Sequence, residues 1–359
     1  MDENRTSDFT LNMTGVLNDI PEAGIILGAY CIFADIISAV ENIVLLFVIW
    51  QCKDLHTPSL FYVVSISVGD LIFALLLQPI VIGAIFLNRW PGGAITCAAF
   101  GYLSYVIAAQ SLITYAIISR DRYVACCKPL SYKTSWIHRK YKIFIILGWI
   151  YSLAICSPPL YGWGEYVLER GSGICALDWT RAKSTFDSLY PYFLGVALYY
   201  PCSIVTLVHY VIIIREMRRF KLGYAERNQQ RERKVAQTIG IAITVFTVCY
   251  AFYVYARLVE KHIPSNAVDA LLWSKLKLAS SLLFITQQFL NPLVYGMLNT
   301  QFRVELIAMF KQFSCFKGNN LIPPTGTMID TSGGPPGGAV VENEHDKRTV
   351  YLITLTLDS

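Results

Sequence analysis

The chain has 359 residues, of which 54% are hydrophobic and only 15% are charged, and its formal net charge at pH 7 is +5. The charged residues lie between long apolar runs, a segregation that a soluble core does not need. An apolar run of about 20 residues matches the ~30 Å hydrocarbon core of a bilayer at ~1.5 Å rise per residue. The composition therefore favours a membrane protein over a soluble one.

Seven such runs predict an all-α membrane protein, a bundle of seven transmembrane helices. They extend over Ile25 to Trp50, Leu60 to Leu87, Ala98 to Val124, Ile143 to Leu160, Leu189 to Ile214, Val235 to Tyr255 and Leu276 to Tyr295. Pro158 and Pro159 end the fourth run early. Gln287, Gln288 and Asn291 interrupt the seventh. A transmembrane β-barrel would show short segments of alternating hydrophobicity instead.

Lysine and arginine set the expected orientation, because cytoplasmic loops carry an excess of both. The loops after the first, third and fifth runs hold Lys53, Lys128, Lys133, Arg139, Lys140, Lys142, Arg215, Arg218, Arg219, Lys221, Arg227, Arg231, Arg233 and Lys234. The loops on the other side mix both signs. We therefore expect a multi-pass plasma-membrane protein with an extracellular N-terminus and a cytoplasmic C-terminus. This asymmetry accounts for the net charge, so no nucleic-acid partner is implied.

Four segments follow from these runs: an extracellular arm (1–24), the bundle (25–298), a short amphipathic surface helix (299–316) and a disordered cytoplasmic tail (317–359). Asn4 and Asn12 begin acceptor triplets for N-glycosylation on the arm. The tail is rich in Pro, Gly and Thr, which cannot bury enough apolar surface to fold. Cys315, at the end of the surface helix, is a candidate for palmitoylation, and an unmodified thiol is the alternative.

Two of the ten cysteines stand apart, because most of the others lie inside predicted helices. Cys97 opens the third helix on the outer side, and Cys175 lies in the second outer loop. Both face an oxidising compartment, so we expect a disulfide between them. Two unpaired outer thiols are the alternative.

Polar residues at similar depth in four predicted helices form a candidate ion site. Asp70 is the acid in the second helix, and Asn42, Ser111 and Asn291 lie in the first, third and seventh. Ionisable groups inside a membrane are costly and usually functional, so the cluster is expected to coordinate a sodium ion or to change its protonation. A structural hydrogen-bond network between helices is the alternative.

A second cluster lies at the predicted cytoplasmic end. Arg122 is flanked by Asp121 and Tyr123, and Glu232 begins the sixth helix on the same side. A planar guanidinium can pair with both carboxylates, so Arg122 and Glu232 are expected to clasp the third and sixth helices in an inactive state. A solvated loop charge is the alternative for Glu232.

The end of the seventh run carries a further candidate switch. Pro292 removes a helix hydrogen bond and lets the last turn rearrange, and Asn291 and Tyr295 flank it. These three residues at this spacing would be weak evidence alone. Their place at the end of a seventh span makes them strong evidence for a rearranging helix end.

Together these residues resemble those of the rhodopsin-like, class A G-protein-coupled receptors. The resemblance covers about Ile25 to Cys315. It implies a receptor that passes a ligand signal to a heterotrimeric G protein, with arrestin and a receptor kinase as partners of its tail. The matching residues are Asn42, Asp70, Cys97, Asp121, Arg122, Tyr123, Trp149, Pro201, Phe246, Cys249, Asn291, Pro292 and Tyr295. Within that class the second outer loop is similar to that of opsins, through Gly162, Trp163, Tyr166, Glu169, Cys175 and Asp178.

The seventh helix departs from the opsin pattern in one chemical respect. Opsins hold retinal as a Schiff base on a lysine seven residues before the proline of this helix, and Ile285 stands there. Isoleucine has no amine, so no covalent retinal is expected. Lys277 lies eight residues earlier, about 12 Å nearer the outside, and Lys275 lies farther still. We expect both to extend to the interface.

Other departures affect the counterion and the switch. Phe100 stands where opsins have an acid in the third helix, and Glu169 occupies the alternative loop position. Without a Schiff base Glu169 is expected to have no cation to stabilise, and so a structural or surface role. Tyr250 replaces the usual tryptophan and Phe252 the usual proline of the sixth helix, so its kink is not carried over. His209 replaces the usual tyrosine of the fifth.

An outer pocket is expected to be aromatic and largely uncharged, which fits a small apolar ligand. Its predicted lining is Ser104, Tyr105, Ala108, Phe193, Ala197, Tyr250, Tyr253, Ser281, Phe284 and Ile285, with Glu169 in the loop above. Ordinary packing also places aromatic side chains inside a bundle. Ser104 stands where amine receptors have aspartate, so a monoamine ligand is not expected.

The leading interpretation is a G-protein-coupled receptor for an apolar ligand, surrounded by membrane lipids. A noncovalent retinoid-binding photoreceptor is the alternative. An ion or proton transporter that uses Asp70 is less favoured, because the sequence has no inverted repeat and no second broken helix. An enzyme is not expected, because the sequence offers no metal-ligand cluster, no nucleophile with a matching base and no phosphate loop.

Overall fold

The computed structural model describes residues 21–87, 89–132, 134–135, 139–169, 174–179, 184–219, 227–262, 270–298 and 302–309. All of these belong to one unit, Met1–Lys311, and the second unit, Gln312–Ser359, lies outside the described residues. Asn4, Asn12 and Cys315 lie outside them as well. The side chains of four further predicted site residues also lie outside the described part: Glu232, Asn291, Pro292 and Tyr295.

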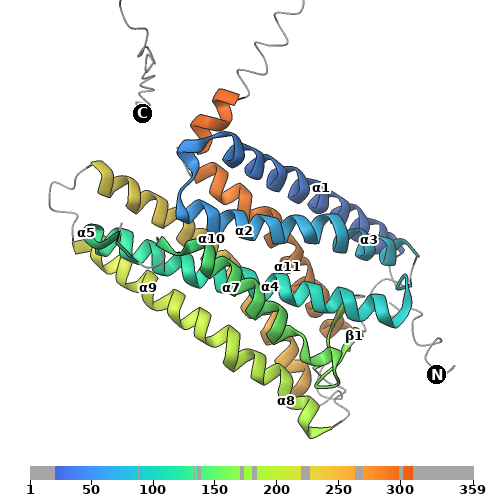
Figure 1. The fold of residues 1–359 in the computed structure, drawn as a ribbon. Coiled ribbons are helices and arrows are strands. Elements are labelled where there is room, and N and C mark those ends of the chain that lie inside the picture. The colour runs from blue at the N-terminus through green and yellow to red at the C-terminus, as the bar shows by residue number, and fades with distance from the viewer. Residues whose placement is uncertain are drawn as a thin grey trace, which may run out of the picture. The chain divides into compact units, whose positions relative to one another are not determined.

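Seven long helical segments cross the described unit and confirm the predicted bundle (Figure 1). They are α1 (Pro21–Gln51), α2 with η4 and α3 (Pro58–Ile72, Phe73–Leu77, Gln78–Leu87), α4 (Gly93–Cys127), α7 (Tyr141–Cys156), α8 with η6 and α9 (Thr185–Leu194, Gly195–Tyr199, Tyr200–Arg219), α10 (Arg227–His262) and α11 (Ala270–Leu298). Five segments are long and apolar enough to span a membrane, and α10 and α11 contain the shorter apolar stretches Ile243–Val259 and Leu278–Leu290.

The central helix of the bundle is α4, which packs against α2, α7, α9 and α10. In the most apolar 18-residue stretch of α4, 67% is buried inside the protein. The corresponding stretches of the other four spans are 17% to 39% buried. The outer helices instead expose Leu, Ile and Phe side chains, as expected of surfaces that face lipid. A side chain on α4 is therefore well placed to contact several helices at once.

Two π-helical turns lie just before prolines and account for irregularities in the second and fifth segments. Phe73–Leu77 precedes Pro79, and Gly195–Tyr199 precedes Pro201. Proline has no N–H, so the carbonyl four residues earlier loses its helical donor. The Tyr151 hydroxyl of α7 donates to the Ala197 carbonyl at 3.0 Å and replaces the bond that Pro201 cannot make.

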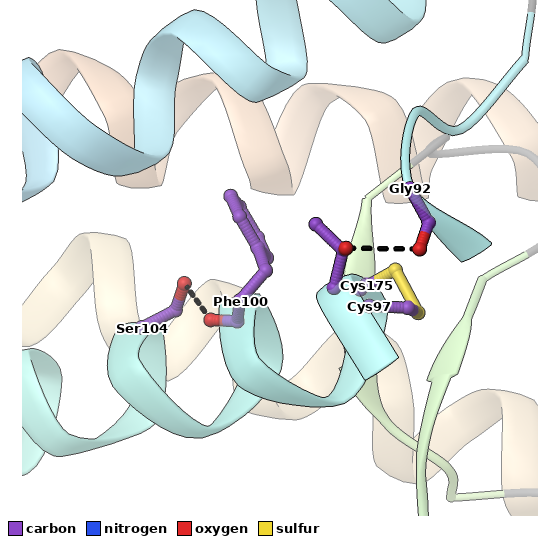
Figure 2. The surroundings of a disulfide bond; sticks show 6 residues. Gly92, Cys97, Phe100, Ser104 and Cys175 are labelled. Atoms are coloured by element: carbon purple, nitrogen blue, oxygen red, sulfur yellow. Dashed lines mark hydrogen bonds between the residues drawn. A yellow bond between two sulfur atoms is a disulfide. The ribbon is translucent and has the colours of Figure 1, made fainter. Parts of the chain in front are cut away.

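One short β-hairpin interrupts the otherwise helical architecture of the described residues. Strands β1 (Tyr166–Leu168) and β2 (Cys175–Leu177) pair antiparallel, with Val167 opposite Ala176. Cys175 is bonded to Cys97 near the start of α4, which confirms the predicted disulfide (Figure 2). Tyr166 donates its hydroxyl to the Cys156 carbonyl at 2.8 Å, so the hairpin is also attached to the end of α7. We call this end of the bundle the disulfide end.

A short helix over residues 302–309 follows α11 and the undescribed residues 299–301. Phe302 is buried in the core, and Leu306 and Met309 pack beside it. Val304 and Ile307 are exposed on another face. This helix therefore has one apolar face in the bundle and a second that is free to contact lipid.

The disulfide should be detectable as a cross-linked peptide pair in protein from the cell surface. Replacing Cys97 or Cys175 with serine should lower the apparent melting temperature, because the bridge closes a loop of 78 residues and such bridges contribute about 2–5 kcal/mol. Cys31→Ser is the matched control, since Cys31 is buried and free. Mass spectrometry that found free thiols at both positions in folded protein would contradict the structure.

Candidate functional site

A cavity opens beneath the hairpin at the disulfide end and encloses about 590 Å³, counting the part that is open to solvent. Nine residues predicted for the pocket line the cavity: Ser104, Tyr105, Ala108, Glu169, Tyr250, Tyr253, Ser281, Phe284 and Ile285. Side chains from η4, α3, α4, β2, α10 and α11 thus meet in one place, together with Glu169 and Ile174 beside the strands.

Phe193 and Ala197, also predicted for the pocket, are not among the residues that line it. The Phe193 ring packs on Trp163 instead, with ring centroids 5.1 Å apart, and Phe186 stacks on Trp163 at 5.0 Å. The Trp163 indole donates to the Phe186 carbonyl at 3.0 Å, which fixes this aromatic group over the start of α8. The helical position of Phe193 was therefore misleading, because a loop tryptophan competes for its ring.

Aromatic rings continue from the cavity into the middle of the bundle. Tyr253 contacts Tyr250, and Tyr250 stacks on Phe246 with centroids 5.9 Å apart. Phe246 packs on Tyr115 of α4 at 4.7 Å. Tyr250 occupies the position where tryptophan was expected from the resemblance, and it lines the floor of the cavity. A ligand above Tyr250 would therefore act on a stack of rings that joins α10 to α4.

An ion pair closes one side of the cavity. The Arg257 Nη2 of α10 donates to the Glu169 Oε2 at 2.6 Å, and the side chains are only 1% and 14% exposed. The Arg257 guanidinium also lies 4.7 Å from the centroid of the Tyr253 ring, within the range of a cation–π contact. The expectation that Glu169 has no cation to stabilise is therefore wrong, whereas the lining is largely uncharged as expected, apart from this ion pair.

Arg257 was missed in the sequence, although a signal was present. It lies four residues after Tyr253, on the same helix face, and close to the end of an apolar stretch. An ionisable residue at such a position is a functional candidate by default. Its partner could not be inferred, because Glu169 belongs to a loop.

Ile285 lies at the base of the cavity and is 4% exposed. It packs with Leu27, Cys31 and Ala34 of α1. The side chain of Lys277 lies outside the described part of the chain, and Lys275 is exposed.

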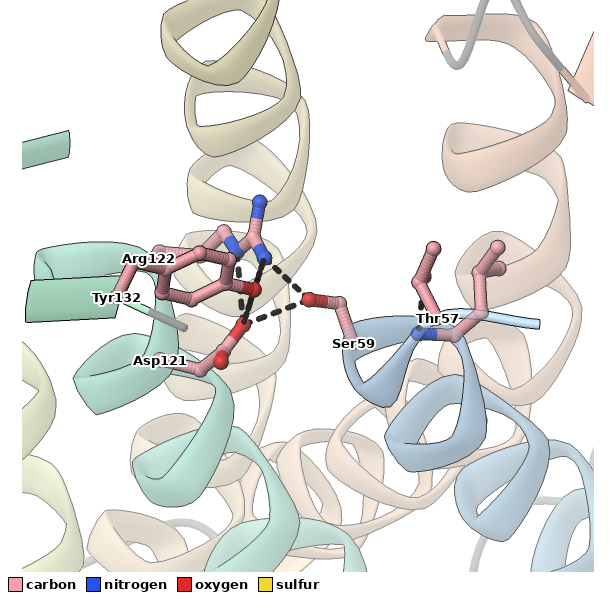
Figure 3. Close-up of polar contacts among 6 residues, drawn as sticks. Thr57, Ser59, Asp121, Arg122 and Tyr132 are labelled. Atoms are coloured by element: carbon pink, nitrogen blue, oxygen red, sulfur yellow. Dashed lines mark hydrogen bonds and ion pairs between the residues drawn. The ribbon is translucent and has the colours of Figure 1, made fainter. Parts of the chain in front are cut away.

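A second polar site lies at the opposite end of α4 and is shown in Figure 3. Arg122 donates to Asp121 Oδ2 from Nη2 at 2.6 Å and from Nε at 3.2 Å. Ser59, at the start of α2, donates to the same oxygen at 2.6 Å and also bonds to Arg122. Arg122 further donates to the Tyr132 hydroxyl of α5 (Pro129–Tyr132) at 3.0 Å. We call this end the Arg122 end, and its network joins α2, α4 and α5.

His209 connects α9 to this end of α4. Its Nδ1 lies 3.0 Å from the Ser119 hydroxyl, and its ring stacks on Tyr123 with centroids 5.2 Å apart. The neighbouring Tyr210 packs against Gly240 of α10, where an added Cβ would lie 2.7 Å from the ring. The fifth and sixth segments are thus in close contact near Arg122, and the clasp with Glu232 stays a prediction.

The predicted ion cluster is buried in the structure. Asp70, Asn42 and Ser111 are 2%, 0% and 4% exposed. The Asn42 amide donates to the Ser38 carbonyl at 2.8 Å, while its own Oδ1 has no hydrogen-bond partner among the side chains that the structure describes. Carboxylate and amide oxygens are the ligand atoms that hard cations prefer, and a bound sodium ion stays a prediction.

A separate polar network joins α2, α4 and α7 and was not predicted. Gln110 donates to Ser65 at 3.1 Å and to Thr114 at 3.2 Å, and the Trp149 indole donates to Ser65 at 3.1 Å. Gly148 leaves room for it, because an added Cβ would lie 2.8 Å from the Gln110 amide oxygen and would force this amide to shift. Such bonds stabilise helix packing in membranes by about 0.6–2 kcal/mol each.

Comparison with known proteins gives consistent matches. Residues 41–295 match the family model "7 transmembrane receptor (rhodopsin family)". The chain is 28% identical to a Gq-coupled rhodopsin of Mizuhopecten yessoensis over 78% of its length and 58% of that protein, and 26% identical to Opsin-3 of Mus musculus over 77% and 67%. It thus spans about three fifths to two thirds of these relatives.

The crystal structure of squid rhodopsin matches 85% of the chain and 93% of its own, with a TM-score of 0.72 at 20% identity. This likeness shows the fold.

The effects of substituting Glu169 and Arg257 on the free energy of unfolding should be strongly coupled. Glu169→Ala leaves a buried cation unpaired and should destabilise the protein by about 3–5 kcal/mol, whereas Glu169→Ala with Arg257→Met should recover most of the loss. The readout is the apparent melting temperature of purified protein. Arg89→Met, an exposed arginine, is the control for removing a guanidinium. Additive losses in the double variant would contradict the pairing.

Proposed function

Because the chain belongs to the 7 transmembrane receptor (rhodopsin family), we propose that it couples a ligand in the cavity beneath the hairpin to a heterotrimeric G protein at the Arg122 end. One observation carries this proposal: α4 contributes both Tyr105 to the cavity and Arg122 to the network. The two residues are 17 positions apart, about 25 Å along one helix. A single rigid element thus reaches both sites.

The disulfide end is proposed to face outward and the Arg122 end the cytoplasm, because the basic loops lie at the latter. Arrestin and a receptor kinase are proposed partners of the tail, and a sodium ion is proposed to bind near Asp70. Relatives of this chain are receptors rather than enzymes.

The proposed ligand binds without a covalent bond. Ile285 offers no amine, and the lining from Phe73, Phe100 and Phe284 is aromatic and apolar. A noncovalent retinoid, with a response to light, is the second candidate; it is favoured by the similarity to proteins named rhodopsin and opsin. An ion or proton transporter is supported only by buried Asp70 and is therefore the weakest candidate.

The variant Glu232→Gln tests the proposed coupling at the Arg122 end. If Glu232 restrains Arg122, removal of its charge should raise basal nucleotide exchange several-fold on a responsive G protein, because α10 is released from α4. Exchange by reconstituted receptor is the measurement. Glu305→Gln is the control, since it removes the same charge beside Cys52 near the same end. Unchanged exchange at normal surface expression would count against the clasp, and the absence of exchange on every G protein tested would count against the receptor proposal.

Incubation with retinal followed by borohydride reduction tests whether a ligand binds covalently in the cavity. The wild-type protein should form no reduced adduct and no visible absorption band, in darkness or light. Ile285→Lys should gain an adduct, and adding Arg257→Met should strengthen the band, because Glu169 is then free to act as counterion. Lys275→Arg and Lys277→Arg identify any competing amine. A wild-type adduct on either lysine would contradict the noncovalent proposal.

A further inference from the structure

The guanidinium of Arg257 has unused hydrogen-bonding capacity at the wall of the cavity. Within the described part of the chain, its Nη2 donates to Glu169 and the Tyr253 ring lies beside it, whereas Nε and Nη1 have no hydrogen-bond acceptor. The residue is 1% exposed, so an acceptor from outside reaches these donors only when a neighbouring group such as Glu169 moves aside. A buried donor without a partner is unfavourable, and a ligand oxygen that reached it would remove this cost.

The remainder of the lining determines what else such a ligand must contain. Phe73, Val81, Phe100, Phe284 and Ile285 line the cavity with hydrocarbon. The Ser104 hydroxyl, which also lines it, already donates to the Phe100 carbonyl at 2.7 Å. Gln78 is a second polar group in the lining, and its amide has no hydrogen-bond partner among the described residues. The matching molecule is therefore an amphiphile with a largely apolar body and an oxygen-bearing end.

Charge balance selects a carboxylate for that end. Arg257 is buried and needs one counter-charge, which Glu169 supplies while no ligand is bound. The Glu169 side chain is 14% exposed and follows β1, where its backbone N–H donates to the Ile174 carbonyl at 3.0 Å. A carboxylate from a ligand can replace it on Arg257, and the displaced Glu169 can turn toward water.

We propose that the cavity binds a long-chain monocarboxylate whose carboxylate takes the place of Glu169 on Arg257. Binding of the carboxylate needs no G protein and does not depend on the proposed receptor function. The effect of binding on signalling does rest on that function. This effect follows from the two connections of the hairpin. The disulfide joins the hairpin to α4, and the ion pair of Glu169 joins it to α10. Exchange of the carboxylates therefore cuts this connection between α4 and α10.

Saturable binding to the full-length receptor in lipid nanodiscs tests the carboxylate. Palmitate is compared with methyl palmitate and palmityl alcohol, and retinoate with retinol, so that straight and ring-ended bodies are both represented. At least one acid should bind about tenfold or more tightly than its neutral counterpart, as expected for a charge-assisted hydrogen bond. Arg257→Gln should reduce this preference to about twofold or less, because the acid loses more affinity than the ester. Arg89→Gln, the exposed matched control, should keep it.

Two further variants test the exchange with Glu169. Glu169→Gln should raise the affinity for the acid about three- to tenfold, because the competing carboxylate is removed, and should leave the ester unchanged. Arg257→Gln with Glu169→Gln leaves no unpaired charge, so it reports on the preference even if the single arginine variant fails to fold. The double variant should show no preference for the acid.

Equal binding of acid and neutral form by the wild type would overturn the proposal. So would a lack of binding by both acids, or a preference that survived in the double variant. A fall in acid affinity in Glu169→Gln would overturn the exchange. Failure of nucleotide exchange, in contrast, would refute the receptor function and leave the measured acid preference intact.

Discussion

In the hydrocarbon of a membrane every backbone N–H and C=O has to find its partner within the protein, and this constraint explains most of the architecture. Helices satisfy it locally, so the chain consists almost entirely of them within the described residues. Where Pro201 breaks the rule, Tyr151 supplies the missing donor to Ala197 from a neighbouring helix. The β-hairpin satisfies its backbone by pairing with itself, and it lies at one end of the bundle.

The same constraint governs the charged side chains. Arg122 is bonded to Asp121, and Arg257 is bonded to Glu169, each at 2.6 Å and nearly fully buried. A buried ion pair contributes little net stability, because desolvation offsets the attraction, but removal of one partner is costly. Such pairs are therefore suited to switching: a ligand that can replace one partner changes the connection without leaving a charge unpaired.

Local sequence patterns predicted what depends on one segment at a time. The seven runs required only a count of apolar residues, and the disulfide required only that Cys97 and Cys175 lie at the same side of the membrane. The ion pair between Glu169 and Arg257 could not be obtained in this way, because the path of the second loop over α10 is a tertiary property. The aromatic packing that draws Phe193 to Trp163 has the same origin.

Several described contacts hold α10 to α4, among them that between the hydroxyls of Tyr105 and Tyr253, which lie 3.5 Å apart. At the disulfide end the connection runs through Cys97, Cys175, Glu169 and Arg257. In the middle, Phe246 lies against Tyr115 with ring centroids 4.7 Å apart. Arg257 is 11 residues, about 16 Å, from Phe246, and Glu232 lies 14 residues, about 21 Å, on the other side. Release of the ion pair thus leaves the Tyr105–Tyr253 contact and the Phe246–Tyr115 contact in place, and any tilt of α10 that follows turns about these two contacts.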